Sequence, residues 1–441
     1  MTLLVVSPDY ASHLYPLATL ATAWRDAGER VVVATGPATD ALVRGFGYER
    51  EHLQLGRGSN PGVIRAEEQP PGEDDALRGF FDATRRGAVA ALTFQASARR
   101  DDLLWNPVGV GRAVQEVVDR VRPDAVVVDH LAFGARLGLT AAGVAYTDVV
   151  LGHPSALVVG DREVYGCPED WPTAFSPDPD GLARLRRLCE QVRDEFTAQW
   201  NDALAQLDPG AAASSDAFAE TGDVLLLNYP EELHDPRRTA LLPRHEFLGS
   251  CVREEPRDEE VDVWLAGSDH PVVYVSLGSF LSARSDVLAR IVDALRGLDV
   301  RVALAHGSTP RAVLGPLPGA WLVRESLPQV TLLQQAAVAV THGGNNSVTE
   351  ALTAGVPLLV LPLSTDQFSG AAAIERHGLG EVLDPNAAGA GALREAVSRL
   401  LEGTTGEDPG RTLLRELATS LRERPGPLRA WDALGERLPA S

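Results

Sequence analysis

The sequence predicts an α/β protein built from two doubly wound, Rossmann-like domains that face each other across a cleft. Its 441 residues are enough for two or three domains. Short runs of β-branched residues alternate with longer segments of helical periodicity, the pattern of parallel strands joined by crossover helices. This alternation occurs twice, on either side of the charged segment 251–262, which lacks apolar periodicity. Ligands of such sheets bind beyond the carboxyl ends of the strands, so the cleft is the expected active site.

The first domain is predicted to span residues 1–250. A helix over 14–27 has apolar residues on one face and ends before Gly28, a residue that suits a helix C-terminus. Two long segments rich in Gly, Pro and acidic residues, 56–75 and 152–180, are expected to be functional loops. The predicted strands of this domain are 3–6, 31–34, 125–128, 144–146 and 224–227.

The second domain is predicted to span residues 263–424, after an interdomain linker at 251–262. A C-terminal helix within 425–441 is expected to return to the first domain. The predicted strands of the second domain are 272–275, 302–305, 321–323, 338–340 and 358–361.

The composition excludes several kinds of chemistry. There are 61 acidic and 40 basic residues, and the net charge of -21 disfavours nucleic acid and anionic membranes as partners. All 40 basic residues are arginine, which excludes a Schiff base to pyridoxal phosphate, a lysine nucleophile and a phosphate-loop lysine. The three cysteines have no paired spacing and predict neither a disulfide framework nor a zinc site. No apolar run approaches the roughly 20 residues of a membrane span, and we expect a cytoplasmic protein.

The densest chemical signal runs from Val340 to Glu350, where a predicted strand ends and a helix begins. Its two glycines allow a ligand to approach the backbone closely. The free N–H groups and the helix dipole, roughly +0.5 charge, favour an anion such as a diphosphate. His342 and Ser347 add side-chain donors, and Glu350 can accept hydrogen bonds from sugar hydroxyls. The alternative is a plain glycine-rich turn with Asn346 as the helix N-cap.

Further motifs surround this segment in a fixed order. Pro328 and Gln329 open the preceding helix, a Gly-Val-Pro turn follows at 355–357, and Asp366 and Gln367 come after the next predicted strand. In this order the motifs resemble the nucleotide-sugar signature of family 1 glycosyltransferases of the GT-B fold. That group includes plant secondary-product and bacterial macrolide and antibiotic glycosyltransferases. The resemblance extends over most of the chain.

The resemblance implies which residues bind a sugar nucleotide. His342, Asn346 and Ser347 would hold the diphosphate, Glu350 the ribose, and Asp366 with Gln367 the hydroxyls of the sugar. Ser279 matches a second phosphate loop at 275–279, for which a simple strand end is the alternative. Two departures from the family pattern leave the nucleobase and the sugar of the donor open. Ser326 stands where many relatives carry tryptophan, and Asn345 stands where the plant enzymes often carry tryptophan. The complete predicted donor site is Ser279, Gln329, His342, Gly343, Gly344, Asn346, Ser347, Glu350, Asp366 and Gln367.

In the first domain, His13 and Pro16 match the H-x-x-P pattern whose histidine is the general base of the family. An imidazole with a pKa near 6.5 is mostly neutral yet basic at working pH and contributes about 100- to 10,000-fold in rate. Asp129, at the end of a predicted strand, matches the acid that orients this histidine, with an ordinary helix cap as its alternative. A minority of six aromatic residues is expected to contact an apolar sugar acceptor. They are Phe80, Phe81, Trp105, Tyr165, Trp171 and Phe175.

The resemblance thus implies an inverting, metal-independent glycosyltransferase. It would move a hexose or deoxyhexose from a nucleoside diphosphate sugar on the second domain to a small, largely apolar natural-product acceptor on the first. No cofactor beyond this co-substrate is expected. Two alternatives stay open: a sugar-nucleotide epimerase of the same architecture, and an inactive homologue that only binds a ligand or assists a true transferase. The residues do not decide the acceptor, the sugar, uridine against thymidine diphosphate, the linkage atom, or monomer against homodimer.

Overall fold

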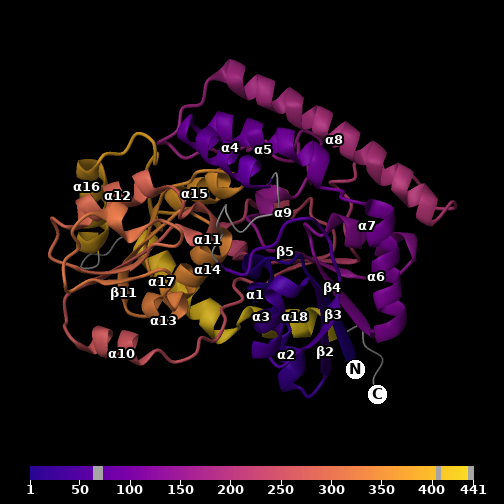
Figure 1. The fold of residues 1–441 in the computed structure, drawn as a ribbon, viewed down its shortest axis with the longest axis horizontal. Helices are drawn as coiled ribbons and strands as arrows, with labels where there is room; N and C mark the ends of the chain where they lie inside the picture. Colours follow the sequence, from indigo (N-terminus) through magenta and orange to yellow (C-terminus); the bar gives the residue numbers. More distant parts are fainter. Residues whose placement is uncertain (63–72, 404–408, 436–441) are drawn as a thin grey trace.

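The computed structural model describes residues 1–62, 73–403 and 409–435 and contains two parallel β-sheets, each between layers of helices (Figure 1). Hydrophobic clusters pack against both faces of each sheet. The predicted fold class is therefore confirmed. Part of the predicted loop 56–75 and residues 436–441 of the predicted C-terminal helix lie outside the described residues. Within the described ranges, no helix is long and apolar enough to cross a membrane.

The first sheet has seven parallel strands in the order β3-β2-β1-β4-β5-β6-β7. In the central strand β1, Leu4 lies opposite Val32 of β2 and Val126 of β4. Alternate residues of β1 enter the clusters on opposite faces, which is why its sequence is apolar throughout. The strands are β1 (Thr2–Val6), β2 (Arg30–Thr35), β3 (Glu49–His52), β4 (Ala125–Asp129), β5 (Thr147–Val150), β6 (Val224–Leu227) and β7 (His245–Phe247).

Helices on this half of the molecule include an outer layer in which α5 packs against α4 and the long α8, along the top of Figure 1. The pair α6 and α7 is packed so closely that a Cβ at Gly138 would lie 2.7 Å from the Cα of Gly111. The helices are α1 (Ala11–Leu20), α2 (Thr22–Asp26), α3 (Asp40–Gly45), α4 (Glu73–Arg85), α5 (Ala88–Asp102), α6 (Pro107–Val121), α7 (Phe133–Ala141), α8 (Pro179–Leu207) and α9 (Pro236–Thr239). Short 3₁₀ turns lie at η1 (Pro37–Thr39), η3 (Pro154–Ala156), η4 (Glu231–Leu233) and, in the second half, η5 (Arg311–Leu314).

The second sheet has six parallel strands in the order β10-β9-β8-β11-β12-β13, which repeats the topology of the first. Its strands are β8 (Val272–Ser276), β9 (Arg301–Ala305), β10 (Leu322–Arg324), β11 (Ala336–Thr341), β12 (Leu358–Val360) and β13 (Gly380–Val382). The helices are α10 (Glu259–Ala266), α11 (Gly278–Leu281), α12 (Ser285–Leu295), α13 (Gln329–Leu333), α14 (Asn345–Ala354), α15 (Gln367–Arg376), α16 (Ala390–Glu402), α17 (Pro409–Glu423) and α18 (Gly426–Gly435). Each strand predicted in this half is present to within two residues at either end.

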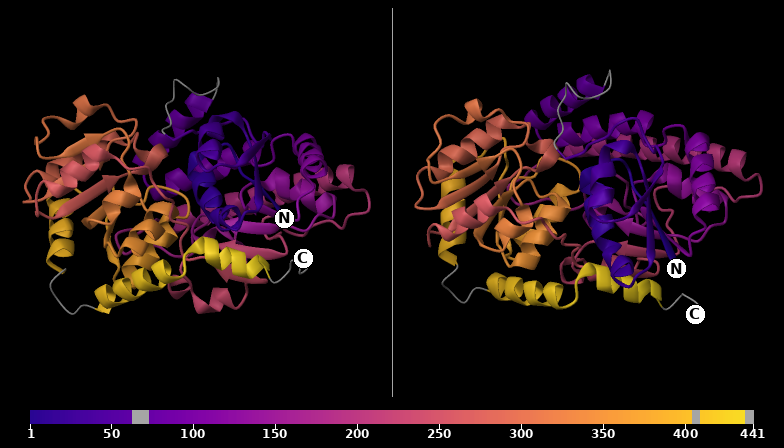
Figure 2. Two further views of the ribbon diagram at one scale, coloured as in Figure 1. Left: turned by 90° about the horizontal axis from the view of Figure 1, so that it is seen from below. Right: turned by 60° about the horizontal axis from the view of Figure 1, so that its bottom comes forward.

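The last two helices lead back from the second sheet to the first. α17 packs against α14, whereas α18 packs on α1, α2 and β7 (Figure 2). Trp431 of α18 meets the fully buried Trp24 edge-on, with ring centroids 5.2 Å apart. Ala430 and Leu434 of the same helix belong to the hydrophobic cluster of β1. Helix α18 is thus part of the core of the first half.

Leu434→Ala is expected to lower the free energy of unfolding by about 2–4 kcal/mol, because it leaves a cavity under α18. Leu434 is 6% exposed, whereas Leu428 on the same helix is 50% exposed. The control Leu428→Ala should therefore change stability by no more than about 0.5 kcal/mol. Denaturant unfolding of both variants measures the difference, and equal losses would show that α18 does not dock as described.

Two predictions about the first half are wrong in position. The predicted strand at 144–146 is in fact β5, three residues later, and it includes Asp148. A strand can bury this carboxylate because Arg136 lies 3.2 Å and His130 3.1 Å from it. The predicted single helix at 14–27 begins earlier, at the start of α1, and is divided at Ala21 between α1 and α2.

Candidate active site

A cavity of about 530 Å³ lies where the carboxyl ends of the two sheets face each other. Its wall follows the ends of β4 and β5 in the first sheet and of β8, β9 and β11 in the second. Most of the predicted site residues line it: His13, Asp129, Ser279, Gln329, His342, Gly344, Asn346, Ser347 and Asp366. Gly343, Glu350 and Gln367 are absent from this wall. The structure therefore brings residues from distant parts of the chain to one place.

His13 and Asp129 form a hydrogen-bonded pair in the first domain. His13 lies in the first turn of α1 and Asp129 ends β4, and the two strands that precede them, β1 and β4, are neighbours in the sheet. The Nδ1 atom of His13 is 2.7 Å from Oδ2 of Asp129, whose other oxygen accepts a hydrogen bond from the backbone N–H of Leu131. A carboxylate only accepts, so the shared proton belongs on Nδ1, and Nε2 is left with a free lone pair.

The charges around His13 make it a stronger base. Burial of the ring disfavours its protonated form, but the attraction and hydrogen bond of Asp129, with a further contribution from Asp366, outweigh that effect. The pKa of His13 is therefore raised above 6.5. The side chain still has 27% of its surface exposed, on the side of the cavity. This is the arrangement expected of an oriented general base.

His342 follows β11 and occupies a narrow slot between glycines. A Cβ at Gly278 would lie 2.6 Å from its Cε1 atom, and a Cβ at Gly344 would lie 2.5 Å from its Nε2 atom. Gly343 has a φ of +85°, and a Cβ there would lie 2.7 Å from Val360. Burial lowers the pKa of His342 to about 4. The imidazole is therefore neutral at pH 7 and can offer an N–H, but no positive charge, to an anion.

The first turn of α14 has unoccupied backbone donors and is joined to the first domain by two asparagines. Gly344 is its N-cap and provides no side-chain cap, so the structure does not bear out Asn346 as the N-cap. Asn345 instead donates hydrogen bonds of 2.8 Å each to the carbonyls of Leu151 and Asn228 in the first domain. Asn346 donates a hydrogen bond of 2.8 Å to the carbonyl of Ser12. That carbonyl is free because Pro16, four residues later in α1, has no N–H.

Arg253, in the predicted linker, is a site residue that the sequence analysis missed. Its guanidinium is 2.7 Å from carboxylate oxygens of both Glu350 and Glu255 and lies 5.0 Å from the ring centre of Tyr15. The other oxygen of Glu350 accepts a hydrogen bond from the amide of Gln329. Burial raises the pKa of Glu350, although Arg253 and Gln329 partly offset this. No local signal marks Arg253 for this role, because most residues of the linker are charged.

Asp366 and Gln367 follow β12 but point in different directions. An oxygen of Asp366 accepts from the backbone N–H of His153, and a Cβ at Gly152 would lie only 2.6 Å from that oxygen. The amide oxygen of Gln367 accepts from the backbone N–H groups of Leu363 and Ser364, at 3.0 and 3.1 Å. Asp366 thus lines the cavity, whereas Gln367 is buried in its own loop. Contact of Gln367 with a sugar stays a prediction.

The chain shows sequence similarity to a known protein family. Residues 186–408, about half of the chain, match the profile described as UDP-glucoronosyl and UDP-glucosyl transferase. The chain belongs to this transferase family. The NDP-glycosyltransferase YjiC of Bacillus licheniformis is 28% identical over 252 residues, 57% of this chain and 62% of that protein. A demethyllactenocin mycarosyltransferase of Streptomyces fradiae is 29% identical over 320 residues, 71% of this chain and 63% of that protein.

The likeness in structure is wider than that in sequence. A solved calicheamicin glycosyltransferase superposes on the transferase with a TM-score of 0.64 and 21% identity, and covers 99% of both chains. At that identity the likeness concerns the GT-B fold. The chain spans a little under two thirds of the length of the two curated relatives named above.

The loop after β5 carries a further part of the first-domain wall of the cavity. Of the six aromatic candidates, Tyr165 lines the cavity, whereas Phe80 and Phe81 pack with Phe280 beside it. Ser326 lines the cavity at the position where many relatives have tryptophan, and Trp321 packs against the hydrophobic cluster of the second sheet instead.

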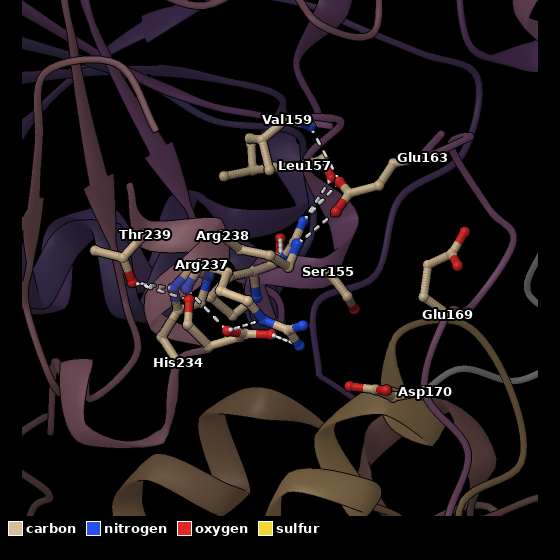
Figure 3. Close-up of polar contacts among 12 residues, drawn as sticks. Ser155, Leu157, Val159, Glu163, Glu169, Asp170, His234, Arg237, Arg238 and Thr239 are labelled. Carbon is tan, nitrogen blue, oxygen red and sulfur yellow. Dashed lines mark hydrogen bonds and ion pairs between the residues drawn. The ribbon is translucent and has the colours of Figure 1, made fainter. Parts of the chain in front are cut away.

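Arg238, which lies in α9, holds this loop against that helix (Figure 3). Its guanidinium bonds to both carboxylate oxygens of Glu163, at 2.6 and 2.9 Å, and to the carbonyls of Pro154 and Leu157. Glu163 also accepts from the backbone N–H of Val159. Burial would raise the pKa of Glu163, but the bonds from Arg238 and Val159 lower it below its usual value. These contacts, termed the Arg238–Glu163 clasp below, therefore hold the first part of the loop, next to Tyr165.

Arg238→Gln is expected to raise the KM for the sugar acceptor about tenfold while the KM for the sugar nucleotide stays constant. The change leaves Glu163 half-buried without its partner, which costs about 1–3 kcal/mol and loosens the loop. The control is Arg237→Gln, because the adjacent Arg237 is 91% exposed and bonds only to Asp235 among the described residues. Initial-rate kinetics with each substrate varied measure the effect, and a changed donor KM would contradict it.

Proposed function

We propose that this transferase moves a hexose or deoxyhexose from a nucleoside diphosphate sugar to a small, largely apolar natural-product acceptor, with inversion and without a metal ion. The observation that carries the proposal is the shared cavity. It brings the His13–Asp129 pair of the first domain opposite the α14 segment of the second. The proposed base lies in the first half and the proposed anion-binding turn in the second. We expect the protein to act in the cytoplasm, without nucleic acid or membrane partners.

The reaction is a single displacement. The Nε2 lone pair of His13 takes the proton of the acceptor hydroxyl as its oxygen attacks the anomeric carbon of the sugar. The new carbon–oxygen bond forms on the face opposite the bond to the diphosphate, which breaks and takes its electron pair with the leaving nucleoside diphosphate. Asp129 stabilises the imidazolium that results and keeps the ring in the required tautomer. One displacement from the opposite face inverts the anomeric centre.

The second domain supplies hydrogen-bond donors for the leaving diphosphate. These are the uncapped first-turn N–H groups of α14, the hydroxyls of Ser279 and Ser347, and the neutral imidazole of His342. Fixed donors and the helix dipole stabilise developing negative charge without reorganisation. In the mechanism proposed here, these groups take the place of a metal ion. Glu350, held by Arg253 and Gln329, is proposed to bind the ribose.

The relatives support the donor and acceptor classes. One is an NDP-glycosyltransferase, and another transfers a mycarosyl group to demethyllactenocin. The lining of the cavity, which includes Tyr15, Leu131, Val150 and Phe280, suits an apolar acceptor.

The test is liquid chromatography coupled to mass spectrometry, which also separates epimers of equal mass, on reactions with uridine and thymidine diphosphate sugars, with and without a panel of phenols and macrolactones. An acceptor-dependent gain of one sugar mass would support the proposal and identify the nucleotide. Conversion of the sugar nucleotide without an acceptor would favour the epimerase instead. Binding of the sugar nucleotide with no conversion would favour the inactive homologue.

A further inference from the structure

Arg99 points a guanidinium into the cavity from the first domain. It lies on α5 and is among the residues that line the cavity. Its guanidinium carbon lies 4.7 Å from the ring centre of Tyr165. Tyr165 is itself buried and packed face to face with Phe218 at 4.2 Å between centroids. The ring therefore gives one face of the guanidinium a rigid apolar support.

No side chain among the described residues forms a hydrogen bond or ion pair with this guanidinium. Its neighbour Arg100, by contrast, forms an ion pair with Glu195 on the protein surface, with a hydrogen bond of 2.7 Å. The cavity's other arginine, Arg253, has two carboxylate partners. Arginine remains charged at any working pH and has five N–H donors. Arg99 thus presents a fixed positive charge with unused donors to the space where a ligand would bind.

The chain is shaped to keep Arg99 in this place. A Cβ at position 166 would lie 2.2 Å from an Nη atom of Arg99, so a larger residue there would displace the guanidinium from its present position. Gly166 also has a φ of +85°, a backbone conformation that other residues rarely adopt. The loop that carries Tyr165 and Gly166 is held by the Arg238–Glu163 clasp. These features therefore position a guanidinium that forms no hydrogen bond or ion pair with the side chains of the described residues.

We propose that Arg99 binds a carboxylate carried by the sugar acceptor. When a guanidinium is stacked on a ring, the N–H groups at its edge stay free, and their fork matches the two oxygens of a carboxylate. The chain as a whole carries a net charge of -21 and repels anions in general, so an anionic acceptor needs such a specific cation. This inference rests on the proposed function, because it takes the first-domain side of the cavity as the place of the acceptor.

The probe is a hydroxycoumarin that bears a carboxylate, compared with the ethyl ester of the same compound. Binding of each to the full chain with uridine diphosphate present is measured by fluorescence titration, and sugar transfer to each is measured by chromatography. The variants are Arg99→Gln, Arg99→Lys and the matched control Arg100→Gln. Thermal unfolding and binding of the neutral ester show whether each variant is folded.

The unaltered chain is expected to bind the carboxylate about 10- to 100-fold more tightly than the ester, the range for a charge-assisted bidentate pair. Arg99→Gln should abolish this preference by weakening the carboxylate alone. Arg99→Lys should keep part of it, because the charge remains and the fork is lost. Arg100→Gln should keep all of it. Equal binding of acid and ester by the unaltered chain, or a preference that survives in Arg99→Gln, would overturn the inference.

A separate arm tests whether the carboxylate belongs to the donor sugar. If Arg99→Gln changes the discrimination between UDP-glucose and UDP-glucuronate and leaves the acid and ester pair unaffected, the assignment to the acceptor is overturned. Failure of the proposed function looks different. Arg99-dependent binding of the carboxylate with no transfer of sugar to either compound would support the carboxylate site and reject the transferase reaction. Transfer to both compounds with no preference would reject the carboxylate site alone.

Discussion

His13→Ala is expected to lower kcat for sugar transfer about 100- to 10,000-fold, the range for loss of a general base. Affinity for the nucleoside diphosphate should be unchanged, because the proposed donors to the diphosphate belong to the second domain. The loss therefore belongs to the chemical step. Single-turnover kinetics give the rate of that step, and calorimetric titration with the nucleoside diphosphate gives the affinity.

His270→Ala is the matched control, since His270 is 54% exposed on the second domain and is absent from the cavity wall. It should leave both quantities within about twofold of the unaltered chain, as for most surface substitutions. If His13→Ala retains the rate of the unaltered chain, another group must take the proton of the acceptor, and the mechanism proposed above is wrong.

Asp129→Asn is expected to lower kcat about 100-fold or more and to shift the pH dependence of kcat/KM. Asn can donate to Nδ1 and so favour the wrong tautomer of His13, which is how an analogous substitution acts in serine proteases. In the unaltered chain, rate falls as pH drops through a His13 pKa above 6.5, because the protonated ring cannot accept a proton. Without Asp129 the burial of the ring dominates and lowers that pKa, so the acidic limb should move to below 6.5.

A pH profile of kcat/KM from about pH 5 to 9 measures this shift, because it reports the pKa of the free enzyme. A fall in rate without movement of the acidic limb would mean that Asp129 positions His13 without setting its charge. An acidic limb that moved upward would contradict the proposed attraction between the two residues.

Some of the active site could be predicted because its signals are local. The turn from β11 into α14 is marked by adjacent glycines and a change from strand to helix periodicity, both of which are visible within about ten residues. The proximity of His13 and Asp129 could be predicted because the carboxyl ends of parallel strands lie at the same edge of a sheet. The 2.7 Å contact between them agrees with that reasoning.

Other features lie outside what local patterns express. The sequence analysis does not predict the edge strands β3, β7 and β13. The sequences of β3 and β7, Glu-Arg-Glu-His and His-Glu-Phe, are mostly polar, as edge strands often are, and β13 has only three residues. The position of β5 was missed because Asp148 is a buried carboxylate, and its partner Arg136 is twelve residues away in α7. In each case, packing determines the strand and local propensity does not.

By itself the sequence determined the alternation of strands and helices, the glycine-rich turn at the start of α14 and the positions of His13 and Asp129 beyond the carboxyl ends of strands of one sheet. These depend on residue size, periodicity and turn chemistry between neighbours in the chain. Only the tertiary structure decided that Arg253 holds Glu350 across 97 positions, that His342 is neutral, and that Arg99 lies on the Tyr165 ring and lines the cavity. Burial and charge pairing depend on which distant segments meet in space, and no local pattern records that.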